Sequence, residues 1–150
     1  AAALRRTMSD DVLLVENVPV EGSSPAGGVI SVWTLNRPEK LNALNAASHD
    51  ALKQACADAE ADDNVRVVVI RGAGPPPASE GKRQKPAAFA AGADISEFAG
   101  KNSDDVRPFF ENNAWERIWN LKTLTPHVVD PAHPPAIIRS RKRINGKLPQ

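Results

Sequence analysis

A turn of small residues is the stretch of this sequence whose composition could support chemistry. It reads Phe89-Ala90-Ala91-Gly92-Ala93-Asp94-Ile95 and leads from an apolar segment into a helix candidate. Residues with so little side-chain bulk let a ligand lie against the backbone, where exposed N–H groups can donate hydrogen bonds to it. The alternative is a strand-to-helix connection whose small residues only permit tight packing. On spacing alone, the packing interpretation is the more common one.

The composition of the chain is that of an ordinary globular domain. It has 150 residues, of which 41% are hydrophobic and 25% are charged, enough for one domain with a real core. The net charge of +1 gives no bulk attraction to nucleic acid or to a membrane, and no apolar run approaches the length of a membrane span. The sole cysteine, Cys56, excludes an intrachain disulfide and fits a reducing compartment or indifference to redox state.

Prolines divide the chain into an organised part and two irregular parts. Proline removes a hydrogen-bond donor and fixes φ, and the 13 prolines concentrate around 75–86 and after residue 126. We therefore expect an organised domain over 10–122, with 75–86 as an atypical loop insertion, and an irregular basic tail over 123–150. The loop carries three basic residues that could bind phosphate, and the cluster in the tail could bind nucleic acid, although a solvated surface is the commoner fate of both.

Three stretches have the pattern of strands. Residues 12–15 and 29–35 are short, apolar and β-branched, and a segment rich in turn residues separates them, which predicts an antiparallel hairpin. Residues 65–70 are apolar on both faces, which is typical of a strand that is central in its sheet or doubly covered. The first two segments should therefore lie beside a third that occupies the middle of a sheet.

Three helices are expected between and after these strands. Asn45 can serve as the N-cap of a helix over 46–61, because apolar residues recur there at helical spacing. A short helix should run to Phe98 and end at Gly100, and a longer one is expected over 103–121, with acidic residues in its first turn.

Some side chains on these helices could in principle do chemistry. Cys56 lies on the apolar face of the first helix, where packing is its expected role, and His49 has no partner pattern, so we expect it to be solvated or to cap the helix. Aromatic residues form one stripe on the last helix, which is typical of core packing, although so wide an apolar face could also seal a partner subunit. These aromatic residues are Phe109, Phe110, Trp115 and Trp119.

Three motifs in this order carry a specific resemblance. They are Thr34-Leu35-Asn36-Arg37-Pro38-Glu39-Lys40-Leu41-Asn42-Ala43-Leu44, Val65-Arg66-Val67-Val68-Val69-Ile70-Arg71-Gly72 and Ala88-Phe89-Ala90-Ala91-Gly92-Ala93-Asp94-Ile95. Together they resemble the N-terminal half of the enoyl-CoA hydratase/isomerase, or crotonase, family over about residues 10–122. The resemblance implies an α/β fold, a crotonase-like spiral of ββα units that is truncated here and followed by an irregular proline-rich tail.

The same resemblance implies a site and a ligand. The ligand would be an acyl-CoA thioester, and the backbone N–H of Ala93 would help to form an oxyanion hole that polarises its carbonyl group, an effect worth about 3 to 4 kcal/mol. CoA is part of the substrate, so no separate cofactor and no metal are implied. Lys40, however, could equally be a solvated turn lysine. The residues implied to bind substrate or CoA are Lys40, Leu41, Ala43, Ala91, Gly92, Asp94 and Ile95.

The implied activity is that of an enoyl-CoA hydratase, which adds water to 2-enoyl-CoA thioesters, or of another enzyme of the family. The family's two catalytic glutamates and its glycine-rich turn belong to a second half that we do not find after Thr123, so the site is expected to be incomplete. The alternative is an inactive fragment that binds CoA weakly or associates with full-length subunits. Homo-oligomers are expected from the family, as is a mitochondrial, peroxisomal or bacterial cytoplasmic location rather than secretion.

Other groups in the chain do not replace the missing ones. Glutamates at 80, 97, 111 and 116 match no catalytic motif, and His127 and His133 lie among prolines without a third ligand, so no metal site is expected. We interpret 75–86 and 123–150 as translated intron or frameshifted sequence, which an uninterrupted exon encoding both would contradict; the alternative is a naturally divergent half-domain. Loss of later ββα turns would expose apolar surface, so the chain is expected to be marginally stable or prone to aggregation.

Overall fold

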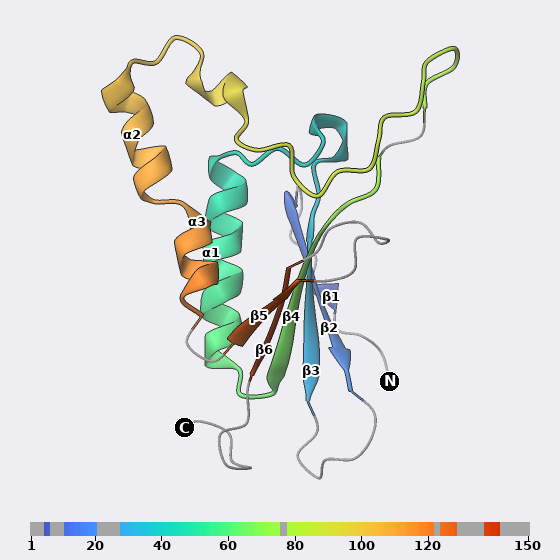
Figure 1. Cartoon of the computed structure of the whole chain (residues 1–150), viewed down its shortest axis with the longest axis vertical. Helices are drawn as coiled ribbons and strands as arrows, with labels where there is room; N and C mark the ends of the chain where they lie inside the picture. The colour runs from blue at the N-terminus through green and yellow to red at the C-terminus, as the bar shows by residue number, and fades with distance from the viewer. Residues whose placement is uncertain are drawn as a thin grey trace.

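A mixed sheet with helices packed beside it forms the framework of the protein (Figure 1). The structure, a computed structural model, describes residues 5–6, 11–20, 28–75, 78–121, 124–128 and 137–141. The strands are β1 (Arg5–Arg6), β2 (Leu13–Pro19), β3 (Val29–Leu35), β4 (Val65–Gly72), β5 (Leu124–Val128) and β6 (Ile137–Arg141), in the spatial order β1-β2-β3-β4-β6-β5. The helices are α1 (Ala46–Ala61), α2 (Ser103–Glu111) and α3 (Ala114–Trp119), and two 3₁₀ helices are η1 (Pro38–Lys40) and η2 (Ile95–Phe98).

The first ββα unit is built as the sequence predicts. Strands β2 and β3 pair antiparallel from Leu13 opposite Leu35 to Pro19 opposite Val29. Helix α1 then carries the chain to β4, which pairs parallel with β3 and lies between β3 and β6. The predicted hairpin and the predicted central strand are therefore both confirmed.

Helix α1 covers one face of this unit and contributes Leu52, Ala55, Cys56 and Ala59 to its core. The Asn45 side chain accepts a hydrogen bond from the backbone N–H of Ser48 at 2.9 Å, which confirms Asn45 as the N-cap. Cys56 is buried on α1, as its predicted packing role requires. The fully buried side chains include Trp33, Leu35, Leu52, Val68 and Ile70.

The predicted helix over 103–121 is wrong in one respect, because it is broken into α2 and α3. Asn113 accepts hydrogen bonds from the backbone N–H groups of Trp115 and Glu116, so it caps a new helix. Such a short polar side chain competes with the helical backbone for its own hydrogen bonds. Helix α2 begins at Ser103, as predicted, and Asn102 is its N-cap, in a capping box with Asp105.

The break changes where the aromatic side chains lie. Helix α3 packs along α1, whereas α2 extends beyond the end of the sheet and has no buried residue (Figure 1). Trp115 packs against the core, but Phe110 is 56% exposed and Trp119 is 68% exposed. The prediction that these aromatics are core residues is therefore confirmed for Trp115 and wrong for Phe110 and Trp119.

The predicted irregular tail is corrected at two segments. Strands β5 and β6 pair antiparallel, and β6 pairs with β4 from Val67 to Ile70. Proline 126 fits within β5 because β5 is the last strand in the sheet order, and an edge strand tolerates a residue that cannot donate. The rest of the predicted tail lies outside the described residues.

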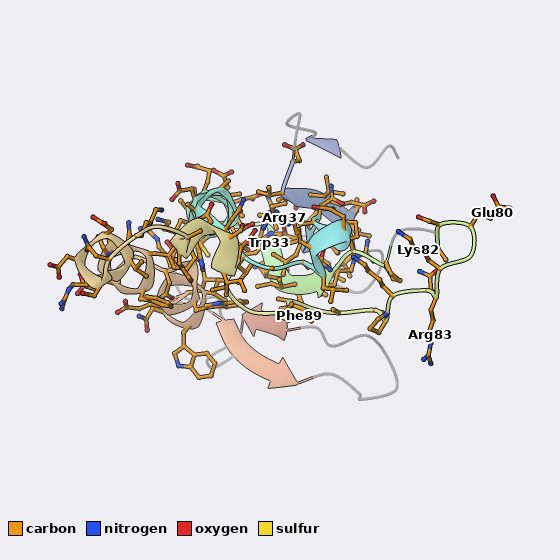
Figure 2. The ribbon with its side chains drawn as sticks, turned by 90° about the horizontal axis from the view of Figure 1, so that it is seen from above. Trp33, Arg37, Glu80, Lys82, Arg83 and Phe89 are labelled. Atoms are coloured by element: carbon orange, nitrogen blue, oxygen red, sulfur yellow. The ribbon has the colours of Figure 1, made fainter. Side chains whose placement is uncertain are left out.

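The loop insertion is irregular, as predicted, in the part that the structure describes. Residues 78–87 are exposed and hold no helix or strand. Figure 2 shows Glu80, Lys82 and Arg83 at the end of a loop that projects away from the sheet. Prolines 76 and 77 lie outside the described residues. No helix in the described ranges is long and apolar enough to cross a membrane.

Candidate functional site

The turn that holds Ala93 is fixed by hydrogen bonds to the segment after η1. Leu44 and Ala93 form a parallel bridge, in which the Leu44 N–H donates to the Gly92 carbonyl and the Asp94 N–H donates to the Leu44 carbonyl, both at 2.8 Å. In such a bridge the residue between the bonded carbonyl and the bonded N–H, here Ala93, directs its own N–H away from the partner strand. The N–H of Ala93 therefore points away from Leu44. Gly92 has φ 107°, a conformation that glycine adopts without strain.

Ala93 lies on the wall of a cavity of about 420 Å³. Within the described residues, no carbonyl or side chain accepts a hydrogen bond from the Ala93 N–H. Phe89, labelled in Figure 2, lines the cavity from the same turn. A backbone donor on a largely apolar wall is the arrangement that stabilises charge on a ligand oxygen. The cavity is lined by Leu44, His49, Phe89, Ala90, Gly92, Ala93, Phe109, Phe110, Asn113 and Trp115.

The Asp94 side chain is used inside the protein. It is buried at 7% exposure, and its Oδ2 lies 2.8 Å from Arg37 Nη2. Its Oδ1 accepts hydrogen bonds from the Ser96 backbone N–H at 3.1 Å and from Ser96 Oγ at 2.6 Å. Arg37 in turn donates to the Ala43 carbonyl at 2.6 Å. The carboxylate therefore ties the turn to the segment that follows β3.

Acid should weaken the protein through Asp94. The hydroxyl of Ser96, followed by Arg37, lowers the pKa of Asp94 from 3.8 to about 2. A carboxylate with a lowered pKa in the folded state stabilises the protein above its unfolded pKa, and this stabilisation is lost as the pH falls from about 3.8 to about 2. We expect the melting temperature of the wild-type protein to fall in this range by more than that of Asp94→Asn.

The matched control for this prediction is Asp104→Asn, because the Asp104 carboxylate is 85% exposed beside Arg107. It should keep the acid response of the wild type. An acid response in Asp94→Asn equal to that of the wild type, measured by circular dichroism between pH 5 and pH 2, would contradict the role of the Asp94 pair.

The structure brings most of the predicted site residues together. The Ala91 N–H donates to the Leu41 carbonyl at 3.0 Å, so the segment over 40–44 runs beside the turn over 91–94. Lys40 is exposed at the end of η1, and Ile95 is 80% exposed at the start of η2, so both flank this pairing rather than lie inside it. The predicted residues that meet in the pairing are Leu41, Ala43, Ala91, Gly92, Ala93 and Asp94.

Asn42 is a residue of the site region to which sequence reasoning gave no role of its own. Its side chain is buried at 2% exposure and its Oδ1 accepts a hydrogen bond from the Arg37 N–H at 3.0 Å. Its Nδ2 donates to the carbonyls of Ala73 and Ala88, each at 2.9 Å. Asn42 thus joins the end of β4 to the residue before Phe89. Its presence in the first motif was the only signal that the sequence offered.

His49 lies where the sequence did not predict it. It is buried at 6% exposure, and its Nδ1 accepts a hydrogen bond from the Ala114 N–H at 3.2 Å. The His49 ring also contacts the Phe109 ring edge to face at 5.0 Å. The prediction of a solvated or capping histidine is therefore wrong. Its partners belong to α2 and α3, which are distant in sequence, so the residue pattern of α1 could not predict them.

Among the residues that the structure describes, acidic groups do not gather at the cavity. Glu97 Oε2 accepts a hydrogen bond from the Ala46 N–H at 2.9 Å and so holds the start of α1, while Glu80, Glu111 and Glu116 are exposed. Over the described part of the chain, no three His, Cys, Asp or Glu side chains are placed to hold a metal ion. The side chains of His127 and His133 lie outside the described residues.

Comparison with known proteins gives a consistent assignment. The family model described as enoyl-CoA hydratase/isomerase matches residues 30–132. A probable enoyl-CoA hydratase of Rhizobium meliloti is 35% identical over 115 residues, which cover 77% of this chain and 37% of the relative. A short-chain-enoyl-CoA hydratase of Clostridium acetobutylicum is 37% identical over 82 residues, which cover 55% of this chain and 27% of the relative.

A solved structure supports the same conclusion. The chain is similar to an enoyl-CoA hydratase/carnithine racemase of Magnetospirillum magneticum, with 30% identity, a TM-score of 0.52 and coverage of 75% of this chain and 35% of that one. The chain thus spans about a third of the length of the proteins it matches. The chain therefore belongs to the enoyl-CoA hydratase/isomerase family and has a crotonase-like α/β fold, which accounts for the three sequence motifs and for the α1 connection between the parallel strands β3 and β4.

Proposed function

We propose that this chain binds an acyl-CoA thioester beside Ala93 and acts as an enoyl-CoA hydratase. One observation carries the proposal: the Ala93 N–H has no acceptor among the described residues and lies on a cavity with aromatic walls. The relatives named as enoyl-CoA hydratases support the reaction class. The thioester carbonyl oxygen would accept a hydrogen bond from the Ala93 N–H, and the acyl chain would lie along the aromatic side chains.

The chemistry follows from where the charge develops. In hydration of a 2-enoyl thioester, the oxygen of water bonds to C3 and gives up one of its protons, while the electrons of the double bond move toward the carbonyl oxygen; the enolate then collapses as a proton is delivered to C2. A preorganised N–H that faces this oxygen in a dry cavity lowers the barrier by about 3 to 4 kcal/mol. The described side chains that line the cavity include no carboxylate, so water activation is not assigned to any of them.

The CoA portion is proposed to lie along the paired segments 40–44 and 91–95. Lys40 offers an exposed positive charge there, and Ile95 offers an exposed apolar side chain. The remaining contacts would be van der Waals contacts with the main chain of Leu41, Ala43, Ala91, Gly92 and Asp94, most of whose N–H and carbonyl groups are already hydrogen-bonded within the protein. CoA is part of this substrate, so the proposal includes no separate cofactor and no metal.

A second candidate is a chain that binds CoA thioesters without hydrating them. The lack of a carboxylate among the described residues of the cavity wall favours it. Association with longer subunits belongs to the same proposal, and the exposed side chains of Phe110 and Trp119 would support it. Light scattering of the purified chain, alone and with a full-length hydratase, measures both this association and the expected homo-oligomer.

Binding and turnover assays test the two candidates together. CoA, crotonyl-CoA and cinnamoyl-CoA are titrated into the protein, and hydration of crotonyl-CoA is followed by loss of its enoyl absorption. Turnover supports the hydratase. Binding without turnover, accompanied by a shift of the cinnamoyl absorption to longer wavelength, supports thioester binding alone, because a donor on the carbonyl polarises the conjugated system. Failure of both thioesters to bind better than CoA contradicts the proposal.

A further inference from the structure

His49 gives the cavity a polar group that the proposed reaction does not use. Its imidazole lies on a wall that is otherwise formed largely by the rings of Phe89, Phe109, Phe110 and Trp115. It is held in place on two sides, by the hydrogen bond from the Ala114 N–H at 3.2 Å and by the edge of Phe109 at 5.0 Å. A side chain fixed from two helices presents its remaining atoms to the cavity in one orientation.

The hydrogen bond from Ala114 decides which ring nitrogen carries the proton. A nitrogen that accepts from a backbone N–H has no proton of its own, so the proton of the neutral ring is on Nε2. Burial, followed by Lys53, lowers the pKa of His49 from 6.5, while Asp50 and Glu97 act in the opposite direction. The ring is therefore neutral at pH 7.5, and Nε2–H is a donor.

This donor has no partner in the described part of the protein. No described residue accepts a hydrogen bond from Nε2, and the only buried side-chain nitrogen or oxygen atoms there without a partner are Asn17 Oδ1 and Arg66 Nη1. Nε2 is therefore reached by solvent, and the open space that His49 lines is the cavity. A donor on an apolar wall costs free energy when a bound ligand covers it without offering an acceptor.

Two other side chains of the wall carry a polar group: Trp115 has an indole N–H, and Asn113 is already committed. Asn113 Oδ1 accepts from the N–H groups of Trp115 and Glu116, and its Nδ2 donates to the Phe110 carbonyl at 2.7 Å. These bonds fix the Asn113 amide as the cap of α3. His49 differs because its bond to the protein uses its acceptor and leaves its donor on the cavity side.

We propose that His49 Nε2–H donates a hydrogen bond to an oxygen on the acyl chain, so that the site selects acyl-CoA thioesters with a carbonyl or hydroxyl group in the chain. This inference rests on the proposed function, since it assigns the acyl group to the same cavity. The aromatic walls hold the hydrocarbon part of the chain, and His49 sets the place of its oxygen. A purely hydrocarbon chain covers the same donor without pairing it, which weakens its binding.

Matched thioesters test this selection at pH 7.5. Pentanoyl-, hexanoyl- and heptanoyl-CoA are each titrated beside the analogue that carries a ketone on the penultimate carbon. Three lengths bring the ketone to three depths in the cavity. We expect one ketone analogue to bind about tenfold more tightly than its hydrocarbon partner, which is the effect of one unmade hydrogen bond at a buried donor.

The variant His49→Asn removes the donor from the cavity. Its shorter side chain places an amide oxygen where Nδ1 lies, so it can still accept from the Ala114 N–H, but it has no group at the position of Nε2. The tenfold ratio should fall to about one. The control is Gln54→Ala, because Gln54 is exposed on the same helix. This variant should keep the wild-type ratio of ketone to hydrocarbon thioester affinity.

A measurement on the wild-type protein covers the case in which His49→Asn does not fold. The imidazole nitrogen NMR signals of the three histidines are followed as the selected ketone analogue is added, and the Nε2–H signal of His49 should shift with that analogue and not with its hydrocarbon partner. Equal binding of ketone and hydrocarbon thioesters at all three lengths, or a ratio retained in His49→Asn, overturns the inference alone. Failure of every thioester to bind better than CoA overturns the proposed function as well.

Discussion

Replacing Asn42 with alanine is expected to lower the free energy of unfolding by about 3 to 5 kcal/mol. The change leaves the Arg37 N–H and the carbonyls of Ala73 and Ala88 without their partner, at a place where Asn42 is 2% exposed. Each buried polar group left unpaired costs about 1 to 3 kcal/mol. Asn42 also has φ 56°, a left-handed conformation that asparagine tolerates better than alanine.

The packing around Asn42 leaves no room for relaxation. A Cβ atom built on Gly72 would lie 2.8 Å from Asn42 Nδ2 and 2.5 Å from the Phe89 carbonyl oxygen. The end of β4 and the start of the Ala93 turn are therefore in direct contact, and Asn42 holds them. Its loss should loosen the turn as well as lower stability, so that thioester binding weakens together with the unfolding midpoint in urea.

Asn64→Ala is the matched control for this variant. The Asn64 side chain is exposed, and its Nδ2 bonds only to the Asp62 carboxylate within the described residues. We expect it to change the unfolding free energy by less than about 1 kcal/mol, because water replaces such a bond. Equal losses for the two variants, measured by urea denaturation, would show that Asn42 does not have the role that its hydrogen bonds indicate.

The parts of the fold that could be predicted from the sequence are those set by local chemistry. Asn45 caps α1 because its side chain reaches the Ser48 N–H three residues later, and that spacing is visible in the sequence. The run from Val65 to Ile70 is apolar on both faces because β4 lies inside the sheet. The break at Asn113 was missed because the apolar stripe continues across it, and only the cap hydrogen bonds distinguish two helices from one.

The strands after residue 122 could not be predicted for a related reason. Proline content argues against regular structure, but it does not distinguish an edge strand from a loop. Strand β6 forms against β4, whose pairing edge lies about seventy residues earlier in the chain, and β5 then pairs with β6. A long-range pairing of this kind leaves no periodic signal in the segment itself.

The candidate site was predictable only in part. The small residues of the turn and its resemblance to a family motif located Ala93. The spacing could not show that Leu44 would form hydrogen bonds with the Gly92 carbonyl and the Asp94 N–H, the groups on either side of Ala93. The motif also suggested Asp94 as a ligand contact, whereas its carboxylate is bonded to Arg37 and Ser96. His49 was missed because its partners are Ala114 and Phe109, which a reading of α1 alone cannot supply.

Replacing Ala93 with proline should remove the proposed oxyanion donor while leaving the hydrogen bonds of the turn in place. Proline has no N–H, and the bonds that fix the turn use the Gly92 carbonyl and the Asp94 N–H instead. We expect thioester binding relative to CoA to weaken about tenfold, as for the loss of one hydrogen bond. Any hydration of crotonyl-CoA should fall by about a hundredfold to a thousandfold, because the bond strengthens as charge develops.

The control is Ala93→Gly, which shortens the side chain and keeps the N–H. It should retain the shift of the cinnamoyl-CoA absorption, and Ala93→Pro should lose it, with both melting temperatures close to that of the wild type. A cinnamoyl shift that survives in Ala93→Pro would mean that another group polarises the carbonyl. In that case the Ala93 turn would be only a packed connection between the sheet and η2, the interpretation that its small residues permit on their own.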